Sequence, residues 1–313
     1  MPKIVFMLLL CLLLAGCEAV GRGIAAELLD ESRSVEKSGR CVVTGYRVPG
    51  TESHLHPGET VKILMIHGIG THSPGYSLLL QENLAKNLGL NVMSRTGRNI
   101  GLRSPENPQT ALGNLRVTFL TEKRILFYEL TWSEITRPQK ELLAYDSSSL
   151  YADRRVVFNR MMKQFLDNAL PDAVYYIGSR RRLIQQSAEQ AMCWMLKTDW
   201  QMLPDFQKGV CLMSPAEQVR AVAAQKMLFI THSLGSKIFI DAFTALAEDM
   251  QKAEAGGSAA AVRRVRDKRL TVFMMANQLP LLHIWSDPAK VNGKIASYCR
   301  PDGRDYDRRI SAV

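Results

Sequence analysis

The run Met-Leu-Phe-Ile-Thr-His-Ser-Leu-Gly-Ser at residues 227–236 constrains the fold of this chain more than any other segment. A short apolar strand ends there, and an amphipathic segment that suits a helix follows over residues 237–250. So abrupt a passage from strand to helix needs a sharp turn, and small residues must let the backbones approach. Gly235 is one such residue, whereas Thr231 is β-branched and crowds the turn. The turn presents the Ser233 hydroxyl above the sheet; alternatively, Ser233 caps the helix, as serine often does.

A second strand and loop lie upstream, in Val-Lys-Ile-Leu-Met-Ile-His-Gly-Ile-Gly-Thr-His at residues 61–72. The apolar, β-branched start of this run predicts a buried strand over residues 61–66. The glycines at 68 and 70 let the following loop approach other backbone closely. We interpret His67 as a loop histidine that hydrogen-bonds the backbone. The loop lacks the Gly-Lys-Ser/Thr ending of a phosphate-binding loop, which excludes that function.

These two motifs, in this order, resemble the α/β-hydrolase superfamily, in particular its lipase and esterase branch, over about residues 60–290. The resemblance implies an α/β fold, with a mostly parallel sheet flanked by helices. It also implies that Ser233 is a nucleophile that cleaves a carboxylic ester or acyl substrate through an acyl-enzyme. The backbone N–H groups of Ile69 and Leu234 would form the oxyanion hole, in which losing one donor costs about 3 kcal/mol. No cofactor and no metal are implied.

The partners of the serine are harder to find. In this superfamily the acid and then the histidine follow the nucleophile. Asp287, in Trp-Ser-Asp-Pro, is our candidate acid, although Asp before Pro also starts turns. No histidine follows it, so His283 is the candidate base despite the changed order; His232 and His72 are weaker candidates. A truncated or altered C-terminus is the other expectation, and it predicts a catalytically inactive hydrolase-fold lipoprotein that serves as an envelope scaffold.

The N-terminus reads as an export signal. Residues 4–14 are apolar but too short for a comfortable membrane span, and they close with Leu-Ala-Gly-Cys. That ending resembles the lipobox of bacterial lipoproteins, which predicts a signal peptide over residues 1–16 and a lipidated Cys17; an ordinary signal peptide or an uncleaved anchor are the alternatives. Glu18 after the cysteine favours the outer membrane over the inner one. Residues 17–40 are polar and predict a tether from the membrane.

The formal charge of +10 gathers in three clusters, at residues 180–182, 263–269 and 304–309. Such clusters suit an anionic membrane surface, or they are solvated helix faces. No aromatic-interleaved basic motif accompanies these clusters, and an exported protein rarely meets nucleic acid, which argues against a nucleic-acid partner.

Four cysteines remain after the predicted maturation, and none forms the Cys-x-x-Cys pair of a zinc site. Cys193 and Cys211 flank a helix and a loop. They could form a disulfide, which export permits, or they could be buried as free thiols.

We expect one domain over residues 41–313, with a helical insertion at 133–226 that either packs as a layer or covers the site as a lid. Further predicted segments are strands at 41–48, 115–120, 124–132 and 270–275, a helix at 76–88, a loop at 89–114 and a flexible connector at 254–262.

Overall fold

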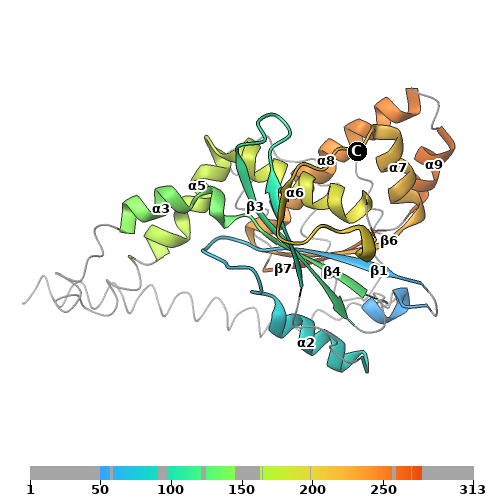
Figure 1. The fold of residues 1–313 in the computed structure, drawn as a ribbon, viewed down its shortest axis with the longest axis horizontal. Helices are drawn as coiled ribbons and strands as arrows, with labels where there is room; N and C mark the ends of the chain where they lie inside the picture. The colour runs from blue at the N-terminus through green and yellow to red at the C-terminus, as the bar shows by residue number, and fades with distance from the viewer. Residues whose placement is uncertain are drawn as a thin grey trace, which may run out of the picture. The chain divides into compact units, whose positions relative to one another are not determined.

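Where the structure describes the chain, seven strands form one sheet in the order β5-β2-β3-β4-β1-β6-β7 (Figure 1). This computed structural model describes residues 50–56, 59–90, 97–120, 125–144, 163, 165–197, 199–255, 259–268 and 270–276. The strands are β1 (Val61–Ile66), β2 (Arg98–Arg103), β3 (Ala111–Leu120), β4 (Ile125–Thr131), β5 (Gln207–Gly209), β6 (Lys226–His232) and β7 (Thr271–Met275).

The sheet is mixed but mostly parallel. Strands β4, β1, β6 and β7 run parallel to one another, and β5 runs parallel to β2. Strand β3 is antiparallel to both of its neighbours, β2 and β4. The predicted α/β class, with a mostly parallel sheet and flanking helices, is therefore confirmed.

Helices cover the two faces of the sheet unequally. One face carries α2 (Leu78–Asn87), and α6 to α9 lie on the other side of the sheet (Figure 1). The remaining helices are α3 (Arg137–Ala144), α5 (Leu170–Ile177), α6 (Arg181–Lys197), α7 (Pro215–Ala224), α8 (Leu234–Ala255), α9 (Ala259–Asp267) and the short 3-10 turns η1 (Thr51–His54), η2 (Ser133–Ile135) and η5 (Trp200–Met202). Among these described helices, none has the length and apolar character that crossing a membrane requires.

The core has two parts because side chains alternate across each strand. Leu64 and Ile66 of β1 point into the cluster under α6 to α9. Ile63 and Met65 point into the cluster under α2, together with Phe127 of β4. All six residues of β1 are buried, Lys62 included, which agrees with the mostly apolar run that predicted this strand.

Three segments differ from the sequence predictions. The predicted loop at 89–114 contains β2 and the start of β3, because Ile100 and Leu102 are fully buried on one face of β2. The glycines and arginines around them masked so short an alternation in the sequence. Among its described residues, the insertion at 133–226 holds the helices α3, α5, α6 and α7 but also β5, which pairs with β2 at the sheet edge. The predicted connector at 254–262 includes the start of α9, where Val262 packs into the core.

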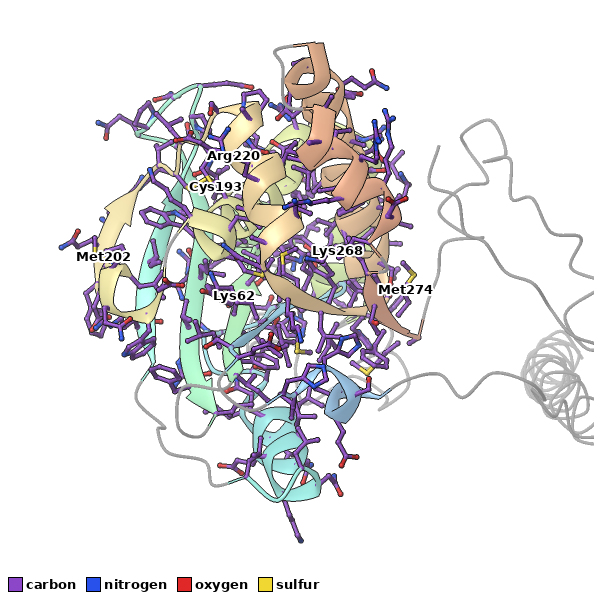
Figure 2. The ribbon with its side chains drawn as sticks, turned by 90° about the vertical axis from the view of Figure 1, so that its right-hand side faces the viewer. Lys62, Cys193, Met202, Arg220, Lys268 and Met274 are labelled. Atoms are coloured by element: carbon purple, nitrogen blue, oxygen red, sulfur yellow. A yellow bond between two sulfur atoms is a disulfide. The ribbon has the colours of Figure 1, made fainter. Side chains whose placement is uncertain are left out.

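Two lysines stabilise helix ends on the side of the sheet that carries α6 to α9 (Figure 2). Lys62 of β1 is buried and donates to the carbonyl of Met195 near the end of α6, at 2.7 Å. Lys268 donates to the carbonyl of Val222 in the last turn of α7, at 2.6 Å. Burial lowers the pKa of both lysines. A cation at a helix C-terminus also complements the helix dipole.

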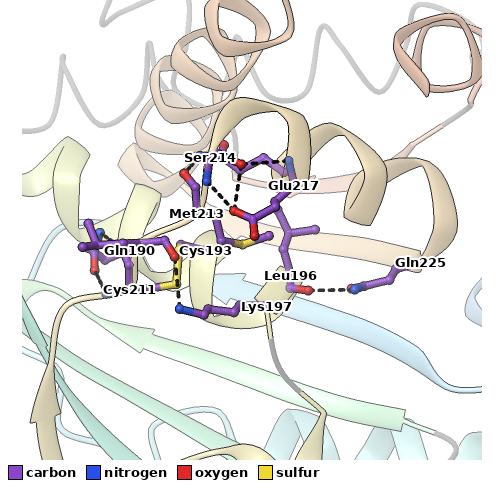
Figure 3. The surroundings of a disulfide bond; sticks show 11 residues. Gln190, Cys193, Leu196, Lys197, Cys211, Met213, Ser214, Glu217 and Gln225 are labelled. Carbon is purple, nitrogen blue, oxygen red and sulfur yellow. Dashed lines mark hydrogen bonds between the residues drawn. A yellow bond between two sulfur atoms is a disulfide. The ribbon is translucent and has the colours of Figure 1, made fainter. Parts of the chain in front are cut away.

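A disulfide joins Cys193 of α6 to Cys211, with the two Cα atoms 5.8 Å apart (Figure 3). Of the two alternatives for this pair, the structure has the disulfide. Beside it, the buried Gln190 side chain accepts from the Cys211 N–H at 2.7 Å and donates to the Cys211 carbonyl at 3.0 Å. Ser214 and Glu217 then form a capping box that starts α7. The covalent bond thus holds the segment that leads into α7 against α6.

Candidate functional site

The turn between β6 and α8 is tight and strained at Ser233. Ser233 has a φ of +49°, in the left-handed region, which costs a residue with a side chain about 1–2 kcal/mol. Two backbone bonds hold it there: its N–H donates to the Met275 carbonyl at 2.9 Å, and its carbonyl accepts from the Ser236 N–H at 3.0 Å. Strain of this kind persists where the surroundings fix it, and such places are often functional.

Glycines let this turn press against the end of β1. A Cβ on Gly235 would lie 2.4 Å from the Ile66 carbonyl oxygen. A Cβ on Gly68 would lie 2.8 Å from both the His232 carbonyl oxygen and the Ser233 Cβ. The His-Gly loop and the serine turn are therefore in direct backbone contact, and neither glycine can take a larger residue without movement.

Thr231, which departs from the expected small residue, is accommodated in the interior. Its side chain is fully buried, and its hydroxyl shares a hydrogen bond with that of Ser236, 2.9 Å away. The β-branched residue thus ties the end of β6 to the first turn of α8.

The site lies at the carboxyl edge of the parallel strands, where open α/β sheets bind ligands. Ile66 pairs with Thr231 and with Leu130, and His232 pairs with Met275. The loops that follow β1, β4, β6 and β7 therefore all begin at this edge.

His67 has both ring nitrogens engaged. Its Nδ1 lies 2.8 Å from the Gly68 carbonyl, and its Nε2 accepts from the Trp132 N–H at 3.2 Å. The Trp132 indole stacks on the imidazole with centroids 4.8 Å apart and donates to the His67 carbonyl at 3.0 Å. Burial holds the pKa of His67 well below its usual value. The interpretation of His67 as a backbone-bonding loop histidine is confirmed, and this neutral ring has no nitrogen free to act as a base.

Among the described residues, nothing hydrogen-bonds the Nε2 of His72. Its ring stacks on that of His67, with centroids 4.0 Å apart. Its Nδ1 donates to the Gly70 carbonyl at 3.2 Å, so the lone pair lies on Nε2. Burial lowers the pKa of His72, which keeps the ring neutral near pH 7. The exposed His232 also lies close to the loop, with its Nδ1 3.1 Å from the position of a Gly68 Cβ.

The predicted oxyanion donors are the N–H groups of Ile69 and Leu234. Leu234 begins α8, so its N–H has no acceptor within the helix. Neither N–H donates to any residue that the structure describes, and the Ser233 hydroxyl makes no hydrogen bond within the same set. The next N–H along the loop, that of Gly70, is already used: it donates to Asp172 at 2.7 Å.

Two buried carboxylates that the sequence did not reveal hold this loop. Asp172 of α5 accepts from Gly70, and Glu129 of β4 accepts from the N–H groups of Gly75 and Ser77. Both carboxylates are fully buried. They lie 102 residues from Gly70 and 52 residues from Ser77 in the sequence, respectively. No local pattern could have connected either carboxylate to the loop.

Three predicted site residues, namely Cys17, His283 and Asp287, lie outside the described residues. The chain toward His283 and Asp287 does leave β7 beside the serine, because Met275 accepts from the Ser233 N–H.

A surface depression of about 340 Å³ lies at the other edge of the sheet, lined by residues that include Arg103 and Lys208. It borders β2 and β5 and is separated from β6 by β3, β4 and β1. We do not assign it to the Ser233 site. Within the described residues, no group of three or more His, Cys, Asp or Glu is placed to hold a metal ion.

Comparisons of this chain with protein-family models, with curated proteins and with solved structures each found no match.

Proposed function

We propose that this chain is a serine hydrolase of α/β-hydrolase-like architecture that cleaves carboxylic esters, with Ser233 as nucleophile. The observation that carries the proposal is the left-handed Ser233 at the β6–α8 turn, pressed against Gly68 of the His-Gly loop. Two neighbouring parallel strands, β1 and β6, deliver these two loops to one edge of the sheet. A strained serine on a strand-to-helix turn suits acyl transfer when it lies beside a loop whose Ile69 N–H donates to no described residue.

In the proposed reaction a histidine takes the proton of the Ser233 hydroxyl as its oxygen attacks the ester carbonyl carbon. The carbonyl oxygen becomes negative and is stabilised by the N–H groups of Ile69 and Leu234. The tetrahedral intermediate collapses, the alcohol leaves with the proton from the histidine, and an acyl-serine remains. Water, activated by the same histidine, then releases the carboxylic acid and restores Ser233.

We assign the base to His283 and the orienting acid to Asp287. His283 follows Ala276 by seven residues, which span at most about 25 Å. Since β7 ends beside Ser233, a segment of this length is long enough to bring His283 to the serine. His67 is excluded because both of its ring nitrogens are engaged. His72, with its free Nε2, is the alternative base among the described residues.

A fluorophosphonate probe, which labels activated serines, tests the proposal. The wild-type protein should be labelled, and Ser233→Ala should not. If His283 is the base, His283→Ala should abolish labelling while His72→Ala retains it. Equal labelling of wild type and Ser233→Ala would overturn the assignment of the nucleophile.

The second candidate is an inactive hydrolase fold that serves as an envelope scaffold. It is favoured by the Ser233 hydroxyl, which makes no hydrogen bond to any described residue. An unlabelled wild type that nonetheless folds and unfolds cooperatively would support this candidate over the enzyme.

We further propose that the protein is anchored in the bacterial outer membrane through lipid on Cys17, in agreement with the Leu-Ala-Gly-Cys sequence. Stable anchoring takes more than one acyl chain, and such lipoproteins carry several. Mass spectrometry of the N-terminal peptide should find these chains. Cys17→Ser should remove the protein from the outer-membrane fraction. An unchanged distribution among the cell fractions would contradict the lipid anchor.

A further inference from the structure

The helical insertion reaches the loop beside Ser233 through one buried carboxylate. Asp172 of α5 is fully buried and accepts three hydrogen bonds. Its Oδ2 accepts from the Gly70 N–H at 2.7 Å and from the Lys140 ammonium at 2.7 Å. Its Oδ1 accepts from the Thr136 hydroxyl at 2.6 Å. One side chain therefore joins the loop after β1, the chain after β4 and helix α5.

This arrangement is poorly explained as a means of stabilising the fold. The side chains of Lys140 and Asp172 are 4% and 0% exposed, so both charges have lost their water. Buried ion pairs of this kind often add little or no stability compared with apolar residues of the same size. What the pair does supply is a fixed acceptor for a single loop N–H.

That N–H belongs to the peptide that follows Ile69. Gly70 has a φ of +108°, which glycine adopts freely and residues with a side chain rarely do. Because Asp172 fixes the Gly70 N–H, it fixes the plane of the Ile69–Gly70 peptide. The Ile69 N–H lies one peptide earlier in the same tight loop, so its direction depends on that anchor.

We propose that Asp172, paired with Lys140, is a positioning residue that aims the Ile69 N–H of the oxyanion loop from within the helical insertion. This inference rests on the proposed hydrolase function. The insertion then has a role beyond covering the sheet: it completes the loop on which the developing negative charge depends. Misplacing a reacting group by about 1 Å can cost about a hundredfold in rate.

A matched pair of double variants isolates the acceptor from the charges. Asp172→Asn/Lys140→Met keeps an amide oxygen that can accept from Gly70, whereas Asp172→Leu/Lys140→Met offers none. Neither variant leaves a buried charge unpaired, so both should fold. Tyr176→Phe is a control on the same helix: it loses a 2.6 Å bond to Asp241 but none to the loop.

The first measurement is the rate of fluorophosphonate labelling, with kcat and KM for a soluble ester. We expect the asparagine variant within about tenfold of wild type, and the leucine variant about a hundredfold slower. The loss should fall on kcat rather than KM, because the oxyanion forms in the transition state. Tyr176→Phe should react at the wild-type rate. Equal rates for the two double variants, whether fast or slow, would overturn the proposal.

The second measurement is hydrogen exchange at the amides of residues 68–72, which needs no activity. Exchange should be faster in the leucine variant than in the asparagine variant, and equal exchange would refute the anchor itself. An unlabelled wild type would refute the hydrolase function and the positioning role with it. The exchange difference would then report a purely structural anchor, so the two failures remain distinguishable.

Discussion

The two halves of the loop between β1 and α2 are held by different kinds of anchor. The half near Ser233 is held at Gly70 by Asp172, which reaches in from the insertion and carries a lysine partner. The half near α2 is held by Glu129, which belongs to the sheet itself and accepts from Gly75 and Ser77. The loop's donors to Glu129 are all neutral groups, including the Ser77 hydroxyl.

Because the anchors differ, one half of the loop is fixed to the sheet and the other half can move with the insertion. Glu129 lies on β4, between β1 and β3, so its half of the loop moves only if the sheet moves. Asp172 lies on α5, outside the sheet, so its half depends on where the insertion sits. Ser233 contacts the half held by Asp172, through Gly68. The half of the loop nearest Ser233 is therefore the half whose position depends on helix α5 of the insertion.

The largest effect on stability is expected from Asp172→Leu alone. This change leaves the Lys140 ammonium buried without its carboxylate, which costs about 4 kcal/mol. Adding Lys140→Met should restore most of that stability, because no charge is then left in the interior. Denaturant unfolding of the single and double variants measures both. If Asp172→Leu is as stable as Asp172→Leu/Lys140→Met, the Lys140 ammonium is not buried away from water, which contradicts the structure.

Removal of the disulfide should cost about 3 kcal/mol, because Cys193 and Cys211 close a loop with a sequence separation of 18 residues. We expect Cys193→Ser/Cys211→Ser to unfold at lower denaturant but to react with the probe at the wild-type rate while folded. This variant controls for general destabilisation. A parallel loss of labelling would mean that any weakening of the insertion disturbs the loop, and not Asp172 in particular.

Glu129→Gln should cost about 2 kcal/mol. The amide keeps one acceptor oxygen, but its NH₂ group replaces the oxygen that had accepted a hydrogen bond from the loop. A buried donor of the loop is then left without an acceptor. Exchange should accelerate at residues 75–77 and much less at residues 68–72, and labelling should fall far less than in Asp172→Leu/Lys140→Met. Equal acceleration over both stretches would show that the two anchors act as one.

The turn at Ser233 and the strands around it could be predicted from sequence, because the signal is local. Strand β1 was predicted with its observed bounds, since an apolar, β-branched run that only Lys62 interrupts ends in His67 and Gly68. Ser233 was identified from the turn chemistry of residues 231–235. The resulting expectation of a strand, a tight turn and a helix needs no knowledge of distant contacts.

The anchors could not be predicted, because nothing near them in sequence shows what they contact. Asp172 sits in Leu-Pro-Asp-Ala, where an acidic residue in a first helical turn is an ordinary surface feature. Glu129 interrupts an apolar strand and reads as a single exposed position. Burial of either carboxylate depends on donors supplied by a loop far away in the chain. Strand β2 was missed for a related reason: its two inward residues gain meaning only when paired with β3.

The smallest effect is a dependence on pH that should appear first in the half of the loop near Ser233. Burial depresses the pKa of His67, so the unfolded chain takes up a proton below about pH 6.5 and the folded chain does not. The contribution of His67 to the free energy of unfolding is therefore fully present above pH 6.5. Below that pH the free energy of unfolding falls by about 1.4 kcal/mol per pH unit for one histidine that stays neutral in the folded chain. His67 accepts from the Trp132 N–H and stacks on His72, so its protonation breaks contacts on this side of the loop. Between pH 7.5 and pH 5.5 the protection factors, which correct for the slower intrinsic exchange at lower pH, should fall at residues 68–72 before they fall at residues 75–77. In His67→Gln the free energy of unfolding should fall less steeply with decreasing pH, since the amide does not titrate. An unchanged slope of stability against pH would assign the effect to other groups and leave the two halves of the loop alike in their response to acid.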